Sequence, residues 1–170
     1  MDRDYHVHST YSDGRFLFQM VRAAAEAGLE GVGIADHCNV SERDDLAEQK
    51  HLLGFNLDQT YERRRAAIER LREEAEVAIY DAVEMDYHQE EETAIAEFLA
   101  AADFQYSIGS VHYLDGVNVH VEPYFTQQST AERERAVDRH FDRLVALVES
   151  ELFDVAAHLD LVERNPALRG

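Results

Sequence analysis

Short apolar runs alternate along this chain with longer segments of helical periodicity. A short apolar run bounded by turn residues is typical of a buried strand, whereas apolar residues spaced three and four apart are typical of a helix packed by one face. The runs predict strands at residues 5–8, 31–35, 77–87, 104–111 and 153–157. The periodic segments predict helices at residues 16–27, 41–53, 57–75, 90–102 and 130–151. This alternation indicates βα units and a parallel sheet.

Two of the predicted helices have an apolar face that we expect to be buried. In the segment 16–27 this face comprises Phe16, Met20, Ala23, Ala24 and Ala27. In the long segment 130–151 it comprises Val137, Phe141, Leu144, Val145 and Val148. The chain has two prolines, no Gly/Ser-rich linker and no clear internal repeat, so we expect one domain over residues 1–170.

The charge of the chain is strongly negative, with 35 acidic against 16 basic residues and a formal net charge of −19. Such a surface repels nucleic-acid phosphates and anionic lipids, so we expect neither as a partner. Excess carboxylates, with Lys50 as the only lysine, favour a halophilic protein kept soluble at high ionic strength. The alternative is an ordinary acidic protein of a low-salt cell.

The compartment is predicted from what the sequence lacks. No apolar stretch approaches the roughly 18 residues that a membrane helix needs, and the first residues lack the apolar segment of a signal peptide. The one cysteine, Cys38, excludes a disulfide scaffold. We therefore expect a cytoplasmic protein.

Histidines gather at the ends of the predicted strands. The side chains at these positions are His6, His8, His37, His112 and His158, and the third strand contributes Glu84 instead. The carboxyl ends of parallel strands meet at one edge of a sheet, where ligands bind. Each residue alone has an ordinary structural explanation, but their joint placement does not. Imidazoles and a carboxylate at one place predict a site for Zn, Mn or Fe.

Five short motifs carry a family resemblance that spans residues 5–161. In order they read HVHSTYSDG (6–14), GIADH (33–37), VEMDY (83–87), GSVHY (109–113) and AHLDL (157–161). With this order and local context, the sequence resembles the polymerase and histidinol phosphatase (PHP) family, and most of all its histidinol-phosphatase-type members. The resemblance implies a distorted TIM-like (β/α)7 barrel. A complete barrel needs roughly 200–250 residues, so we expect an incomplete one with about five βα units.

The resemblance also implies two to three divalent ions and their ligands. His6, His8 and Glu84 would hold the first ion, and Glu84 would bridge to a second ion held by His112 and His158. Asp13 and His37 would hold the third, and Asp36 would orient His37 or its neighbours. Glu84, His112 and Asp36 are accordingly the predicted catalytic residues.

This sequence departs from the family in one respect. Family members continue to a later Asp-x-His motif that supplies one ligand each to the first and third ions, and no such motif follows residue 160 here. We therefore expect a fragment, a split gene product, or a protein that completes its site by association. Exposed edges of an incomplete sheet also predict a homo-oligomer.

The expected reaction is hydrolysis of a small phosphomonoester such as histidinol phosphate by a water activated between metal ions. Arg15 and Arg164 follow strand-end motifs and are the predicted phosphate ligands. Arg63, Arg64 and Arg65 are expected to form surface ion pairs, and Cys38 is not expected to be a nucleophile. Two alternatives stay open: a phosphodiesterase or exonuclease acting on nucleotides, and an inactive metal-binding protein.

Overall fold

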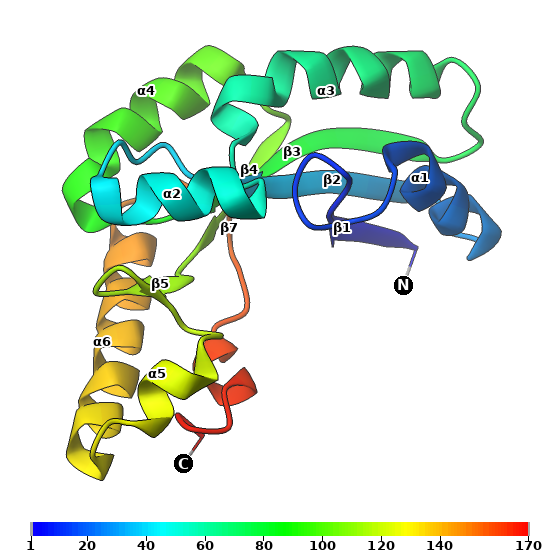
Figure 1. Ribbon diagram of the computed structural model, residues 1–170. Helices are drawn as coiled ribbons and strands as arrows, with labels where there is room; N and C mark the ends of the chain where they lie inside the picture. Colours follow the sequence, from blue (N-terminus) through cyan, green and yellow to red (C-terminus); the bar gives the residue numbers. More distant parts are fainter. Residues whose placement is uncertain (1, 170) are drawn as a thin grey trace.

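The computed structural model describes residues 2–169, apart from the side chains of residues 45 and 47–49. The protein has an α/β fold built on a five-stranded parallel sheet with strand order β1-β2-β3-β4-β7 (Figure 1). These strands are β1 (Arg3–Val7), β2 (Gly31–Cys38), β3 (Ala78–Asp86), β4 (Tyr106–Ser110) and β7 (Val155–Ala156). The sheet curls into half of a barrel, so the predicted incomplete TIM-like architecture is confirmed.

Five longer helices connect the strands: α1 (Leu17–Glu26), α2 (Asp44–Leu53), α3 (Leu57–Arg72), α4 (Glu92–Ala102) and α6 (Thr130–Glu149). Each lies within a predicted helical segment. The start of α6 is fixed by a capping box, in which Ser129 and Glu132 satisfy each other's backbone N–H groups. No helix among residues 2–169 is both long and apolar enough to cross a lipid bilayer.

The helices cover the convex face of the sheet, where the main core lies. Side chains alternate between the two faces of a strand, so every second residue of β2 and β3 points to this core. One part of it contains Val32, Ile34, Ile68 and Ile79, and another contains Cys38, Val83, Met85 and Ile95. The intervening residues of the same strands face the concave side, which is where the candidate site lies.

The curl of the sheet brings β4 close to β1. The Tyr106 hydroxyl, on β4, donates a hydrogen bond to the Tyr5 carbonyl of β1. Gly33 of β2 lies between them, and a Cβ atom there would be only 1.7 Å from the Tyr106 hydroxyl. The concave face thus requires glycine at this position, because the tyrosine crosses directly over the backbone.

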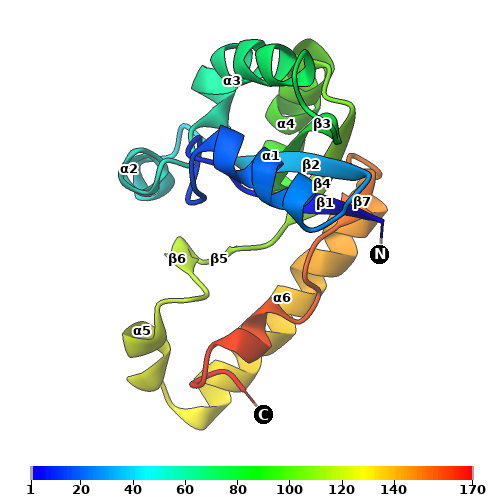
Figure 2. The same ribbon diagram turned by 90° about the vertical axis from the view of Figure 1, so that its right-hand side faces the viewer.

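A smaller unit extends from the carboxyl ends of the strands (Figure 2). It contains the hairpin β5 (Tyr113–Leu114) and β6 (Val117–Asn118), the short helix α5 (Glu122–Thr126) and the 3-10 turn η2 (Leu161–Arg164). A second 3-10 turn, η1 (Gln89–Glu91), connects β3 to α4. Residues from the hairpin, α5, α6 and the C-terminal segment form the smaller unit's own apolar cluster, which includes Leu114, Phe125, Ala136, Leu161 and Leu168. The sequence pattern predicts no element between residues 112 and 129, because these strands and turns are too short to show a period.

The predicted buried faces of two helices are largely wrong: of their members, Ala24 and Leu144 are buried as predicted. On α1 the buried residues are Leu17, Val21 and Ala24, whereas Phe16, just before the helix, is exposed. On α6 the buried residues are Ala136, His140, Leu144 and Leu147. Phe141, Val145 and Val148 instead form an exposed apolar stripe. Both helices carry apolar residues on more than one face, and on α6 the buried face includes a histidine that hydrophobicity alone does not select.

Candidate metal centre

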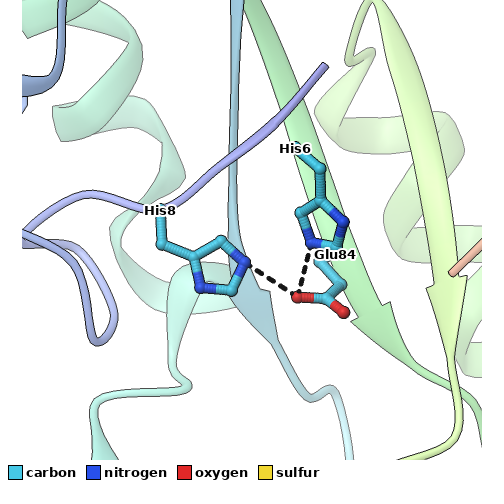
Figure 3. Close-up of side chains that lie close together, drawn as sticks. All are labelled: His6, His8 and Glu84. Carbon is cyan, nitrogen blue, oxygen red and sulfur yellow. Dashed lines mark ion pairs between the residues drawn. The ribbon is translucent and has the colours of Figure 1, made fainter. Parts of the chain in front are cut away.

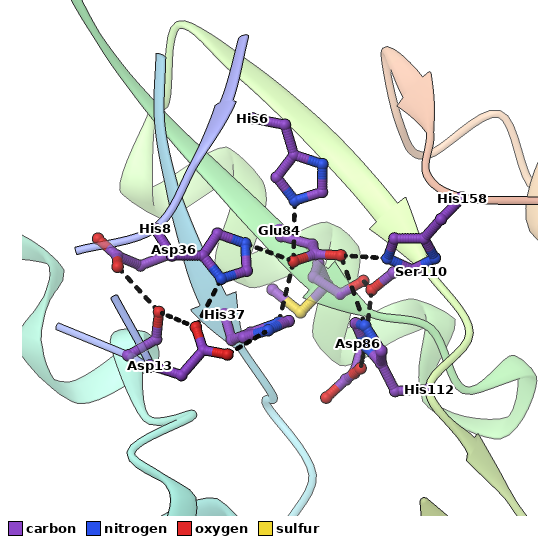
Figure 4. A network of polar contacts seen from close by, with 12 residues as sticks. His6, His8, Asp13, Asp36, His37, Glu84, Asp86, Ser110, His112 and His158 are labelled. Atoms are coloured by element: carbon purple, nitrogen blue, oxygen red, sulfur yellow. Dashed lines mark hydrogen bonds and ion pairs between the residues drawn. The ribbon is translucent and has the colours of Figure 1, made fainter. Parts of the chain in front are cut away.

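The Glu84 carboxylate is the centre of the site and is fully buried on the concave face of β3. One of its oxygens, Oε2, lies 3.0 Å from His6 Nε2, 2.9 Å from His8 Nε2 and 3.0 Å from His37 Nδ1 (Figures 3 and 4). The other, Oε1, lies 2.8 Å from His158 Nε2 and 3.6 Å from His112 Nε2. Five imidazoles from four strands or strand ends therefore surround one carboxylate.

The strand register explains why distant residues meet here. His37 of β2 is paired directly with Glu84 of β3. His6 lies on β1, and His158 follows β7 at the opposite edge, yet their rings stack with centroids 6.1 Å apart. The curl of the sheet therefore brings its two outer strands to the same place.

The donor atoms fit a divalent cation. His6 Nε2, His37 Nδ1 and Glu84 Oε2 are buried and make no hydrogen bond of good geometry within the described chain, although each of the two nitrogens lies 3.0 Å from Glu84 Oε2. Two ligands bound at about 2.1 Å to one ion are about 3.0 Å apart when they subtend a right angle. Buried lone pairs that converge in this way are satisfied when they share a cation.

The structure groups the predicted ligands into three sets, each with donor atoms within 4.8 Å of one another: His6–His8–Glu84, His8–Asp13–His37 and His37–Glu84–His112. The first set is the one that the family resemblance implies for the first ion. The second adds His8 to the implied Asp13–His37 pair. In the third, His37 stands beside Glu84 and His112, and His158 approaches Glu84 through the other carboxylate oxygen. All seven predicted ligands are thus brought together, and their assignment to individual ions stays a prediction.

Two carboxylates orient the histidines from behind. Asp86 Oδ1 lies 2.5 Å from His112 Nδ1, and Asp13 Oδ1 lies 2.6 Å from His8 Nδ1. A hydrogen bond at Nδ1 fixes the tautomer and directs the Nε2 lone pair toward the centre. The VEMDY motif contains Asp86, but its role could not be predicted, because nothing in its spacing shows which histidine it meets.

Asp36 is predicted to orient His37 or its neighbours, and the structure excludes only the direct contact with His37. Its carboxylate does not contact His37, since alternate residues of β2 point to opposite faces. It accepts hydrogen bonds from Ser9, Ser12 and Arg64 instead. The prediction that Arg64 lies on the surface is wrong: its side chain is fully buried between β2, β3 and α3.

The carboxylates and imidazoles of the site shift one another's pKa values toward the charged forms. Burial alone would raise the pKa of Glu84, but the surrounding imidazoles, foremost His158 through its hydrogen bond to Oε1, hold it well below the usual range. Burial likewise opposes protonation of His8, and the Glu84 and Asp13 carboxylates outweigh it and raise the pKa of His8 to about 9. Without a metal, His8 therefore carries an extra proton near neutral pH, held between the Glu84 and Asp13 carboxylates.

Comparison with known proteins decides the family. The family model described as "PHP domain" matches residues 4–168. This chain belongs to the PHP domain family. No curated protein matches the chain.

Two solved structures share the fold of this PHP domain. One is a histidinol phosphate phosphatase from Lactococcus lactis, crystallised with zinc, L-histidinol and phosphate, with a TM-score of 0.74 and 23% identity over 96% of this chain. The other is a putative histidinol phosphatase from Listeria monocytogenes, with a TM-score of 0.72 and 16% identity over 95% of this chain. The chain spans 59% of the length of the first protein and 68% of the second.

The seven predicted metal ligands of the PHP domain line an open cleft of about 360 Å³. Besides the ligands, the cleft is lined by His120, Leu161 and Arg164. Arg164 lines the cleft, so its role as a phosphate ligand stays a prediction, whereas Arg15 is exposed and does not line the cleft. His120 was not predictable as a site residue, because it lies in an irregular segment and follows no predicted strand.

Proposed function

We propose that this PHP domain hydrolyses a small phosphomonoester of the histidinol phosphate type with the help of two to three divalent ions, Zn, Mn or Fe. The observation that carries the proposal is the convergence of five imidazoles on the buried Glu84 carboxylate. The fold shared with a phosphatase crystallised with zinc and phosphate supports it.

Divalent ions in this centre would lower the pKa of a water molecule to about 7 and offset the charge of a phosphate group. The protein supplies the geometry. Glu84 and the histidines would hold the ions, and Asp86 keeps the His112 imidazole oriented. Arg164 at the cleft offers a guanidinium that binds two phosphate oxygens at once.

No protein nucleophile takes part in the proposed reaction. Cys38 is fully buried in the convex core, and burial raises the pKa of its thiol. Its sulfur therefore cannot reach a substrate in the cleft. The strongly acidic chain favours a small substrate over a nucleic acid, because long-range repulsion acts on every additional phosphate.

The test compares Glu84→Gln with Glu97→Gln, which makes the same change at an exposed site on α4. Both proteins are loaded with Mn²⁺, Zn²⁺ or Fe²⁺, their metal content is measured, and turnover of p-nitrophenyl phosphate is followed. We expect Glu84→Gln to lose metal and about 100-fold or more of the activity, and Glu97→Gln to match the wild type.

Two other outcomes would overturn the proposal. Preferential cleavage of bis(p-nitrophenyl) phosphate would favour a phosphodiesterase acting on nucleotides. A wild-type protein that holds metal but turns over neither ester would be a metal-binding protein without this activity.

A further inference from the structure

One buried arginine connects the helix layer to the candidate metal centre. Arg64 of α3 has no solvent exposure. Its Nη1 donates to Asp36 Oδ2 at 3.1 Å, and its Nη2 donates to Asp81 Oδ1 at 2.7 Å and to the Ala82 carbonyl. A single guanidinium thereby joins α3, β2 and β3 directly behind the strands that carry His37 and Glu84.

Asp36, which Arg64 binds, also binds the loop that follows β1. Besides Arg64, the carboxylate accepts hydrogen bonds from Ser9 N at 2.6 Å, Ser9 Oγ at 2.8 Å and Ser12 Oγ at 2.9 Å. Within the loop, the N–H groups of Ser12 and Gly14 donate to the Ser9 carbonyl. The loop is therefore folded around the Asp36 carboxylate.

This loop delivers a predicted metal ligand. Asp13 lies inside it, and His8 immediately precedes it. Asp13 Oδ1 lies 2.6 Å from His8 Nδ1, and Asp13 Oδ2 lies 3.8 Å from His37 Nε2. Because Asp13 itself is exposed, the position of its carboxylate depends on the loop backbone and not on surrounding packing.

Stability alone is a weak reason for burying Arg64. A buried ion pair gains little over apolar residues of similar volume, because the charges lose their hydration. The same helix already neutralises Asp81 from the side, since Arg65 Nε donates to Asp81 Oδ2 at 2.6 Å. Arg64 differs from Arg65 in its contact with Asp36 and in its complete burial, since the Arg65 side chain is 32% exposed.

We propose that Arg64 is a positioning residue for the metal centre: by fixing the Asp36 carboxylate, it sets the Ser9–Gly14 loop and so places Asp13 beside His8 and His37. The inference rests on the proposed function only in requiring that the centre binds metal. It assigns Arg64 an effect on metal affinity that a residue serving only stability would not have.

The test titrates Co²⁺ into the metal-free full chain and follows its visible absorption. Arg64→Lys keeps the charge but replaces the planar fork with one ammonium group, which cannot hold Asp36 and Asp81 together. We expect Co²⁺ binding about 10-fold or more weaker. The matched control is Arg65→Lys, which disturbs the same Asp81 but not Asp36, and we expect its Co²⁺ affinity to equal that of the wild type.

A double-variant cycle separates positioning from a general loss of structure. In an Asp13→Asn background, Arg64→Lys should have no further effect on Co²⁺ affinity, because the ligand that it positions is already impaired. Circular dichroism and thermal unfolding of each variant show that it is folded. If Arg64→Lys does not fold, the nearly isosteric Asp36→Asn variant takes its place with the same expected loss.

The results separate this inference from the proposed function. Co²⁺ binding by Arg64→Lys, or by its substitute, that equals wild-type binding overturns the inference and leaves the proposed function intact. An equal loss with and without Asp13 also overturns it. A wild-type protein that binds no Co²⁺ overturns the proposed function, and the inference with it.

Discussion

His112 Nδ1 lies 2.5 Å from Asp86 Oδ1, and both side chains are buried behind Glu84. Burial lowers the pKa of His112, but the charge and the hydrogen bond of Asp86 outweigh it and raise that pKa. The carboxylate therefore makes the imidazole a stronger base and holds its Nε2 toward the centre. Ser110 Oγ, 3.1 Å from the same nitrogen, supports this orientation.

We predict that Asp86→Asn weakens metal binding by about 10- to 100-fold, because a neutral amide neither fixes the His112 tautomer nor raises its basicity. Isothermal titration with Mn²⁺ measures the affinity directly. Asp142→Asn, on the exposed side of α6, is the control for the same chemical change. An Asp86→Asn protein with wild-type Mn²⁺ affinity would show that His112 is not oriented through Asp86.

We predict that Gly33→Ala destabilises the protein by about 1–3 kcal/mol. The added Cβ would lie 1.7 Å from the Tyr106 hydroxyl and 3.0 Å from the Tyr5 carbonyl, so the tyrosine must leave its place across β2. Urea unfolding measures the change. Adding Tyr106→Phe to Gly33→Ala should restore part of the lost stability, because it removes the atom of closest contact. A Gly33→Ala protein as stable as the wild type would contradict the close approach of β4 to β1.

The convergence of the ligands could be predicted from sequence because it follows from one general rule. In a parallel sheet the carboxyl ends of the strands meet at one edge. His6, His37 and His158 lie at or near such ends, so their meeting needed only the strand positions. The residues behind them were out of reach, because the roles of Asp86 and Arg64 depend on which side chain each one meets across the sheet.

Arg64 shows why charge patterns mislead at single positions. Three consecutive arginines on a polar helix predict an exposed face, and Arg63 is indeed exposed. Successive residues of a helix are about 100° apart, so one of the three can face the sheet. The two aspartates that neutralise it, Asp36 and Asp81, are distant in sequence and lie on different strands.

The open edges of the sheet keep self-association as a prediction. Within the described chain, β1 pairs only with β2, and β7 only with β4. Val155 of β7 is exposed, and so is the stripe of Phe141, Val145 and Val148 on the neighbouring helix α6. We expect a dimer that strengthens with salt, because the net charge of −19 opposes contact until it is screened.

Multi-angle light scattering at low and high NaCl concentration tests this expectation. Val145→Glu should shift the protein to monomer, whereas Leu52→Glu, an equally apolar-to-acidic change at an exposed position of α2, should not. A wild-type monomer at both salt concentrations would contradict self-association.

The response of the centre to pH is predicted to have opposite signs without and with metal. In the metal-free protein the raised pKa of His8, about 9, means that the folded state binds a proton more tightly than the unfolded chain, whose histidines titrate near 6.5. The resulting stabilisation is fully present below about pH 6.5 and is lost as the pH rises through about 9. The pKa of Glu84 is lowered in the folded state, so its carboxylate stabilises the fold at every pH above the usual pKa of a glutamate. This stabilisation is lost only when the pH falls into the acid range, and it does not change between pH 6.5 and 9.5. The melting temperature in EDTA should therefore fall between pH 6.5 and 9.5.

Over the same interval Mn²⁺ affinity should rise, because the ion replaces the His8 proton. Thermal unfolding and Mn²⁺ titration across this range measure both trends, and Asp13→Asn, which removes one of the two carboxylates that hold the proton, should flatten the first. A metal-free protein that gains stability over this interval would show that His8 carries no extra proton between Glu84 and Asp13.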